Sequence, residues 1–131
     1  MDLQNIYDPK VKYLPLLKHP NIIELHGYSM DDRCQPCLIY PYMKNGTLGD
    51  YLKKKKMPLT SDQRLKIAVK VGEGIEYIHT QTRVVNGKEQ VLVHRDIKPQ
   101  NILLDDDLEP KVNFFVLFYY PNCARLNDFI T

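Results

Sequence analysis

The residues best suited to chemistry stand together in residues 94–101, with the sequence His-Arg-Asp-Ile-Lys-Pro-Gln-Asn. Asp96 offers a carboxylate that can accept a proton from a hydroxyl group, and Lys98 offers a cation for a phosphoryl group in transit. Asn101 offers an amide oxygen of the kind that binds magnesium. These residue types at this spacing, followed directly by an apolar run at 102–104, seldom occur in an ordinary polar loop. The segment therefore predicts a phosphoryl-transfer site.

Two capping patterns predict helices that come before this segment in the chain. Thr47 stands three residues before Asp50, and Thr60 stands three residues before Gln63. Each threonine hydroxyl can therefore accept a hydrogen bond from a backbone amide in the first turn of a helix. The predicted helices cover residues 48–55 and 61–79.

The longer predicted helix carries apolar residues at spacings of three and four, which indicates one buried face. The expected face consists of Leu65, Ala68, Val71, Ile75 and Ile78. Gly72 and Gly74 weaken a helix relative to alanine, so we expect close packing at both positions.

Short apolar runs and turn residues predict several strands. Asn86-Gly87 between two valine-rich runs is typical of a two-residue hairpin turn. The expected strands are residues 22–28, 37–42, 84–85, 91–93 and 102–104, with a further strand beginning at 111–112. We also expect a turn at 30–33, another at 105–107, and a short helix within 9–18 that Pro15 interrupts. Helices and hairpins are mixed without strict alternation, so the predicted fold class is α+β.

The bulk composition narrows the functional classes. The chain has 131 residues, 44% of them hydrophobic and 26% charged, as in a globular domain, and a net charge of only +2. Such a charge does not favour nucleic acid or an anionic membrane as a partner. No apolar run approaches the roughly 20 residues of a membrane span. Cys34 and Cys37 lack a second pair that would complete a zinc site. We expect a protein of the reducing cytoplasm.

The pattern His-Arg-Asp-x-Lys-x-x-Asn resembles the catalytic-loop signature of eukaryotic protein kinases. This resemblance implies that Asp96 is the base that orients the substrate hydroxyl and that Lys98 neutralises the γ-phosphate of ATP. Asn101 would bind magnesium, His94 would pack beneath the site, and Arg95 would contact a phosphorylated activation segment. A lysine two residues after the aspartate resembles the serine/threonine class of these kinases.

The segment around Tyr40 resembles the hinge between the two lobes of a kinase. His-Pro-Asn-Ile at 19–22 resembles the link from helix C to the fourth strand, and Tyr40 takes the gatekeeper position. Together with the run Tyr-Met-x-Asn-Gly-Thr-Leu at 42–48, this tyrosine resembles the interleukin-1-receptor-associated and Pelle kinases and the related plant receptor-like kinases. The adenine contacts that the resemblance implies are Tyr40, Pro41, Tyr42, Met43 and Leu103.

Parts of the kinase pattern are missing from this sequence. No glycine-rich loop or strand lysine precedes residue 9, and Lys10 stands near the place of the helix C glutamate. Phe114 stands where the magnesium-binding aspartate is expected. We therefore expect a partial kinase domain over residues 9–112, made of the end of the small lobe, the hinge and the first half of the large lobe. The tail, 113–131, has no kinase feature, and its abrupt start favours a wrong reading frame or an unspliced intron.

The expected function is that of a serine/threonine protein kinase in receptor-proximal signalling. Its cofactors would be ATP and magnesium, its substrates proteins, and its further partners receptor-complex adaptors or kinases. The chain alone is expected to be inactive because of the missing parts. The alternative is a non-catalytic, kinase-like interaction module, either a pseudokinase or a truncated scaffold. A thermal shift that depends on nucleotide would favour the kinase over the module.

Overall fold

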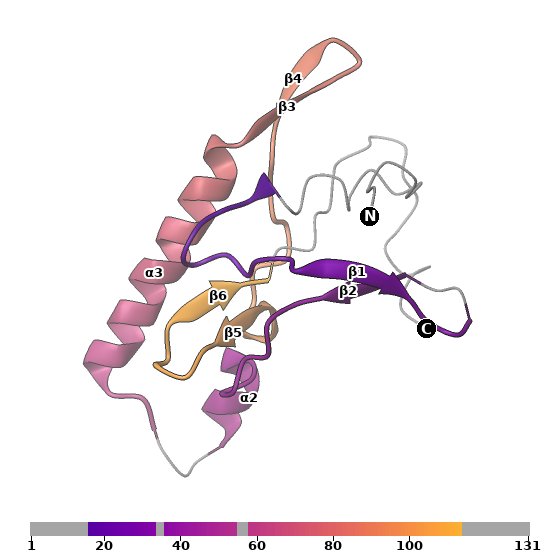
Figure 1. Ribbon diagram of the computed structural model, residues 1–131. Coiled ribbons are helices and arrows are strands. Elements are labelled where there is room, and N and C mark those ends of the chain that lie inside the picture. The colour runs from indigo at the N-terminus through magenta and orange to yellow at the C-terminus, as the bar shows by residue number, and fades with distance from the viewer. Residues whose placement is uncertain (1–15, 34–35, 55–57, 114–131) are drawn as a thin grey trace.

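A computed structural model describes residues 16–33, 36–54 and 58–113 (Figure 1). In these ranges three antiparallel strand pairs accompany two α-helices and one 3-10 helix. The elements are β1 (Gly27–Met30), β2 (Pro36–Ile39), α2 (Leu48–Lys53), α3 (Ser61–Thr80), β3 (Thr82–Val85), β4 (Lys88–Val91), η3 (Pro99–Asn101), β5 (Ile102–Leu104) and β6 (Pro110–Val112). This mixture confirms the predicted α+β class. The predicted helix within 9–18 lies mostly outside the described residues.

Both helices begin at the predicted caps. The Thr47 hydroxyl accepts a hydrogen bond from the Asp50 amide at 3.0 Å. The Thr60 hydroxyl accepts one from the Gln63 amide at 3.2 Å, and the Gln63 side chain accepts one from the Thr60 amide at 2.9 Å. These bonds satisfy amides that the first turn of a helix leaves without a partner. The first turn of α3 is therefore fixed by local sequence.

The buried face of α3 differs from the predicted one. The residues that it buries are Ile67, Val71, Gly74 and Ile78. Their spacing of four, three and four follows the helical repeat of about 3.6 residues. Leu65 lies six residues before Val71, which places it about a third of a turn from the buried face. Its side chain is 67% exposed, and Ala68 is exposed as well, so the prediction was wrong for the first half of the face.

The two glycines of α3 have different surroundings. A Cβ atom at Gly74 would lie only 2.9 Å from the carbonyl oxygen of Asn21, too close for any side chain. At Gly72 nothing lies within 4 Å of such an atom. The expected close packing is therefore confirmed at Gly74 and wrong at Gly72.

The hairpin of β1 and β2 forms as predicted, with shifted bounds. β1 and β2 pair from Gly27↔Ile39 to Met30↔Pro36, so the predicted strand 22–28 is paired within β1 only from Gly27 onward. Ile22 instead forms an isolated parallel bridge with Val112. The Ile23 amide also donates to the Val112 carbonyl at 3.0 Å, whereas the chain reaches β2 only at His26, whose amide donates to the Ile39 carbonyl at 2.8 Å.

The β3–β4 hairpin turns at Asn86 and Gly87, which have φ angles of 51° and 74°. Positive φ at both turn residues matches the right-handed twist of the flanking strands. With a turn of two residues, Val85 must pair with Lys88. The second strand therefore runs over 88–91, and the predicted strand at 91–93 was placed too late.

The hydrophobic core lies between α3 and the β5–β6 pair (Figure 1). Leu104 and Val112, one from each strand, are fully buried there, as is Ile78 of α3. These two strands confirm the predictions at 102–104 and from 111 onward. The turn between them closes on Asp105, whose carboxylate accepts hydrogen bonds from the Asp107 and Glu109 amides at 2.9 Å each. Among the described residues, no helix is both long and apolar enough to cross a membrane.

Candidate active site

The catalytic-loop segment runs from the buried His94 to the 3-10 helix η3 and leads directly into β5. Asp96 and Lys98 form an ion pair at its surface, with 2.8 Å between the carboxylate Oδ2 and the ammonium Nζ. Both side chains are roughly half exposed. A carboxylate and an ammonium group therefore stand side by side within reach of solvent, where a hydroxyl and a phosphoryl group could meet them.

Asn101 contacts the same aspartate through its side chain. Its Nδ2 donates to the backbone oxygen of Asp96 at 2.9 Å and to the carboxylate Oδ2 at 2.8 Å. The Asn101 amide also donates to the Lys98 carbonyl at 2.9 Å, which closes the turn of η3. With both hydrogens of Nδ2 directed at Asp96, the side-chain oxygen of Asn101 remains as an acceptor.

His94 lies beneath this group, and only 2% of it is exposed. Its Nδ1 accepts a hydrogen bond from the Asp96 amide at 3.1 Å, and its Nε2 is 2.8 Å from the carbonyl oxygen of Asn113. Since Nδ1 accepts, Nε2 carries the proton and donates to that carbonyl. Burial holds the pKa of His94 below its ordinary value of 6.5, which agrees with a neutral ring.

Two hydrogen bonds of the Asn113 backbone connect His94 with Asn101. Its amide donates to the Asn101 carbonyl at 2.8 Å, while its carbonyl accepts from His94. Asp96, His94, Asn113 and Asn101 are thus joined in a ring of hydrogen bonds. Asn113 was not predicted as a site residue, because it acts through backbone groups that any residue type would supply. A backbone contact leaves no signal in residue identity.

The charge state of Asp96 follows from its neighbours. The hydrogen bond from Lys98 lowers the pKa of the Asp96 carboxyl below its ordinary value, and the bond from Asn101 adds to this effect. Asp96 is therefore ionised at neutral pH. A carboxylate with a lowered pKa is a weak base, so it is better suited to orienting a hydroxyl than to removing its proton early.

Arg95 adopts a strained backbone next to the aspartate. Its φ angle of 66° lies in the left-handed region, which residues other than glycine seldom occupy. Such strain persists only where the surrounding structure fixes the backbone on both sides. Here the flanking His94 and Asp96 are both fixed by the hydrogen-bonded ring.

Tyr40, which the sequence predicts at a gatekeeper position, follows β2 and packs against the hydrophobic core. Its hydroxyl is buried without a hydrogen-bond partner among the described residues, and burial raises the pKa of Tyr40. Pro41 and Met43 are half-buried, whereas Tyr42 is 88% exposed. The Tyr42 side chain therefore points to solvent, which leaves its backbone as the part available for a ligand.

Leu103 on β5 meets the segment that follows the hinge. It forms an isolated antiparallel bridge with Thr47, and the Leu104 amide donates to the Gly46 carbonyl at 2.9 Å. The Gly46 amide donates in turn to the Met43 carbonyl at 3.0 Å. The structure thus brings two predicted adenine contacts, Leu103 and Met43, to neighbouring segments.

Several sequence predictions cannot be placed. Lys10, Cys34 and Phe114 lie outside the described residues. Within the described ranges, no group of three or more histidine, cysteine, aspartate or glutamate side chains is arranged to hold a metal ion.

Comparison with known proteins identifies the family. Residues 4–124 match the family model described as protein tyrosine and serine/threonine kinase. The chain is 41% identical over 109 residues to a putative leucine-rich repeat receptor-like serine/threonine-protein kinase of Arabidopsis thaliana, covering 82% of this chain and 12% of that protein. It is 40% identical over 122 residues to the serine/threonine-protein kinase pelle of Drosophila melanogaster, covering 89% of this chain and 23% of pelle.

A third relative, the probable serine/threonine-protein kinase PBL23 of Arabidopsis thaliana, is 39% identical over 112 residues, which are 82% of this chain and 27% of that protein. The chain therefore spans only 12% to 27% of the length of these three relatives. The resemblance to the Pelle and receptor-like kinases, drawn from the hinge and the catalytic loop, is confirmed. The chain belongs to the protein tyrosine and serine/threonine kinase family.

Proposed function

We propose that this chain supplies the hinge and the catalytic loop of a serine/threonine protein kinase, which transfers the γ-phosphate of ATP to protein hydroxyls. The observation that carries the proposal is the place of the Asp96 carboxylate. Its Oδ2 lies 2.8 Å from both Lys98 Nζ and Asn101 Nδ2, at a surface that solvent reaches. The family includes tyrosine kinases, so the serine/threonine assignment rests on Lys98 and on the similarity to serine/threonine-protein kinases such as PBL23 and pelle.

Each of the three polar side chains has a distinct role in this proposal. Asp96 orients the substrate hydroxyl, and its lowered pKa keeps it ionised while it does so. Lys98 turns from Asp96 toward the γ-phosphate as the negative charge there shifts. Asn101 holds Asp96 with its amide nitrogen and offers its oxygen to magnesium, a hard cation that prefers oxygen ligands. Magnesium, when bound with ATP, neutralises charge on the phosphates.

The adenine would bind between the hinge and β5. In this proposal, backbone groups of Pro41, Tyr42 and Met43 bond the base, and Leu103 lies under it. Tyr40 closes the back of the site with its half-buried ring. The bonds from Leu104 to Gly46 and from Gly46 to Met43 support this arrangement because they keep β5 beside the hinge.

Residues 1–131 alone should transfer no phosphoryl group at a useful rate. The proposed partial domain, 9–112, has Lys10 near the place of the helix C glutamate, and the proposed tail, 113–131, has Phe114 at the magnesium aspartate. Each missing electrostatic contact costs a factor of about 10² to 10³ in rate. The second candidate is a non-catalytic interaction module, which would not need the missing contacts.

The proposed partners are protein substrates together with receptor-complex adaptors or kinases, by analogy with the receptor-like relatives and pelle. The proposed compartment is the cytoplasm, where ATP and magnesium are abundant. The matched region is only 12% of the receptor-like relative and 23% of pelle, so partners and compartment are proposed for this chain and not transferred as facts.

A chimaera tests the catalytic proposal. Residues 16–113 replace the matching segment of the pelle kinase domain, which supplies the glycine-rich loop, the strand lysine and the magnesium aspartate. We expect radiolabel transfer from ATP to serine or threonine in a protein substrate. Asp96→Asn should lower kcat by at least about 10²-fold and leave the affinity for ATP within about threefold, because Asp96 positions the hydroxyl and does not hold nucleotide.

The matched control is Asp106→Asn, since Asp106 is an exposed carboxylate on the turn after β5. It should leave both kcat and ATP affinity unchanged. Equal losses of ATP binding and turnover in Asp96→Asn would show that its role is misassigned. A chimaera that binds partner proteins but neither binds ATP nor transfers phosphate would favour the interaction module.

A further inference from the structure

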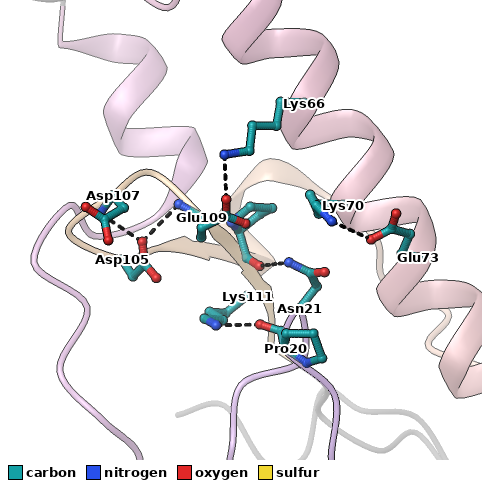
Figure 2. A network of polar contacts seen from close by, with 10 residues as sticks. Pro20, Asn21, Lys66, Lys70, Glu73, Asp105, Asp107, Glu109 and Lys111 are labelled. Carbon is teal, nitrogen blue, oxygen red and sulfur yellow. Dashed lines mark hydrogen bonds and ion pairs between the residues drawn. The ribbon is translucent and has the colours of Figure 1, made fainter.

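Asn21 is an almost fully buried polar residue, 2% exposed, that lies far from the catalytic loop in the sequence. Its side-chain Nδ2 donates to the Pro110 carbonyl at 3.0 Å. Figure 2 shows Asn21 directed at the strand that carries Glu109 and Lys111. Its own carbonyl oxygen accepts from the Val112 amide at 2.8 Å. Pro110 and Val112 are the first and last residues of β6. The Asn21 side chain thus holds the start of β6, while its backbone carbonyl, a group that any residue would supply, holds the end.

The end of β6 is joined to the catalytic loop. Val112 is followed by Asn113, whose amide and carbonyl bind the Asn101 carbonyl and the His94 ring, each at 2.8 Å. Those two residues in turn hold Asp96 through its amide, its carbonyl and its carboxylate. A displacement of Val112 therefore passes through a single peptide unit to the ring of bonds around Asp96.

The unpaired side-chain oxygen of Asn21 indicates that this residue does more than stabilise the fold. Its Oδ1 is buried with no hydrogen-bond partner among the described residues. An unpaired buried acceptor destabilises a fold, whereas an apolar residue of similar size carries no such penalty. The residue thus retains an unpaired oxygen while its amide nitrogen holds β6, which fits a positioning role better than a packing role.

We propose that Asn21 is a positioning residue for Asp96, acting through its side-chain bond to Pro110 and from there along β6 to Asn113. The proposal rests on the proposed function, because only a reaction at Asp96 gives its placement a consequence. Gly74 completes the arrangement, since a Cβ atom there would lie 2.9 Å from the same Asn21 carbonyl that binds Val112. Helix α3 can therefore lie directly against Asn21 only because Gly74 has no side chain.

Amide hydrogen exchange on the 131-residue chain tests this coupling without any phosphoryl transfer. In Asn21→Ala we expect the Asn113 and Asp96 amides to exchange at least tenfold faster, relative to the change at the Val71 and Ile75 amides inside α3. A residue that contributed only to global stability would accelerate all four amides equally, because they would exchange through the same unfolding. Equal acceleration, or no acceleration at Asp96, would overturn the proposal.

The matched control is Ile78→Val, which removes one methylene from a fully buried core residue outside the hydrogen-bonded ring. It should change all four amides by similar factors. If Asn21→Ala does not fold, the unaltered chain still decides the matter in low concentrations of urea. There the amides of Val112, Asn113 and Asp96 should exchange through one shared opening with the same dependence on urea. Separate openings for Val112 and Asp96 would overturn the proposal.

These measurements are independent of the chimaera. Phosphoryl transfer that survives Asp96→Asn would contradict the proposed function and leave the exchange result unchanged. Independent opening of β6 and the catalytic loop would contradict the positioning role and leave catalysis by Asp96 intact. The two failures are therefore distinguishable.

Discussion

The catalytic loop and the β3–β4 hairpin are neighbours in the sequence, yet the fold holds them by different means. The hairpin is fixed by its own ladder, from Thr82↔Val91 to Val85↔Lys88. It projects beyond the end of α3 in Figure 1, and its Val84 side chain is 70% exposed. The catalytic loop has no such ladder. It is held by hydrogen bonds of the buried His94 imidazole to the Asp96 amide and to the carbonyl of Asn113, the residue after β6.

The hairpin depends on local sequence, whereas the position of the loop depends on distant contacts. A hairpin with an Asn-Gly turn forms from local sequence, so it tolerates exposed apolar side chains and needs little from the core. A loop that must present a carboxylate at a set position needs partners from distant parts of the chain. Substitutions that act on the core should therefore disturb the loop, whereas substitutions on the hairpin should leave it unchanged.

The largest expected effect is that of His94→Ala. This change removes a buried ring and leaves the Asp96 amide and the Asn113 carbonyl without their partner. We expect the free energy of unfolding to fall by about 2–4 kcal/mol, as measured by urea denaturation. The control is His79→Ala on the exposed last turn of α3, which should cost less than about 0.5 kcal/mol. Similar losses at the two histidines would remove the distinction between the loop and the surface.

Gly74→Ala should have the next largest effect. The added Cβ would lie 2.9 Å from the Asn21 carbonyl, so α3 or the 19–22 segment must shift. We expect a net destabilisation of about 1–3 kcal/mol in thermal or urea unfolding, despite the better helix propensity of alanine. Gly72→Ala is the matched control because that position is open, and it should stabilise α3 by about 0.5–1 kcal/mol. Stabilisation by both changes would refute the close contact.

The third expectation concerns pH and His94. Burial lowers the pKa of this histidine in the folded state below the 6.5 of the unfolded chain. Between these two values the unfolded state binds more protons, so stability must fall as pH drops from about 6.5 toward the folded pKa. The slope from this one group reaches at most about 1.4 kcal/mol per pH unit. His94→Gln should remove that component, and an unchanged slope in the variant would assign the acid sensitivity to other groups.

The smallest expected effect is that of Val84→Thr in the hairpin. The side chain is exposed and the strand keeps a β-branched residue, so the free energy of unfolding should change by less than about 0.5 kcal/mol. Calorimetric melting of the two proteins measures this difference. A loss above about 1 kcal/mol would mean that the hairpin is packed against other parts of the chain, and the contrast with the catalytic loop would no longer hold.

Short-range features of this protein follow from its sequence alone. The capping threonines Thr47 and Thr60 bond residues three positions away, and the Asn86-Gly87 turn needs only its own two φ angles. The residue types at 94–101 also predict phosphoryl transfer, since a carboxylate, an ammonium and an amide group at this spacing have few other uses. All of these signals lie within a few neighbouring positions, so they can be recognised before the chain folds.

Only the tertiary structure decided which groups hold Asp96 in place. The bond from His94 to Asn113 spans 19 positions and uses a backbone carbonyl, while the bond from Asn21 to Pro110 spans 89. The burial of Ile67 in place of Leu65 was settled in the same way, because the face of α3 that packs on β6 is set by the strand and by Gly74. Backbone partners and distant neighbours leave no pattern in local residue types, so the groups that contact Asp96 are known only from the folded chain, in which β6 packs against α3 and Asn21.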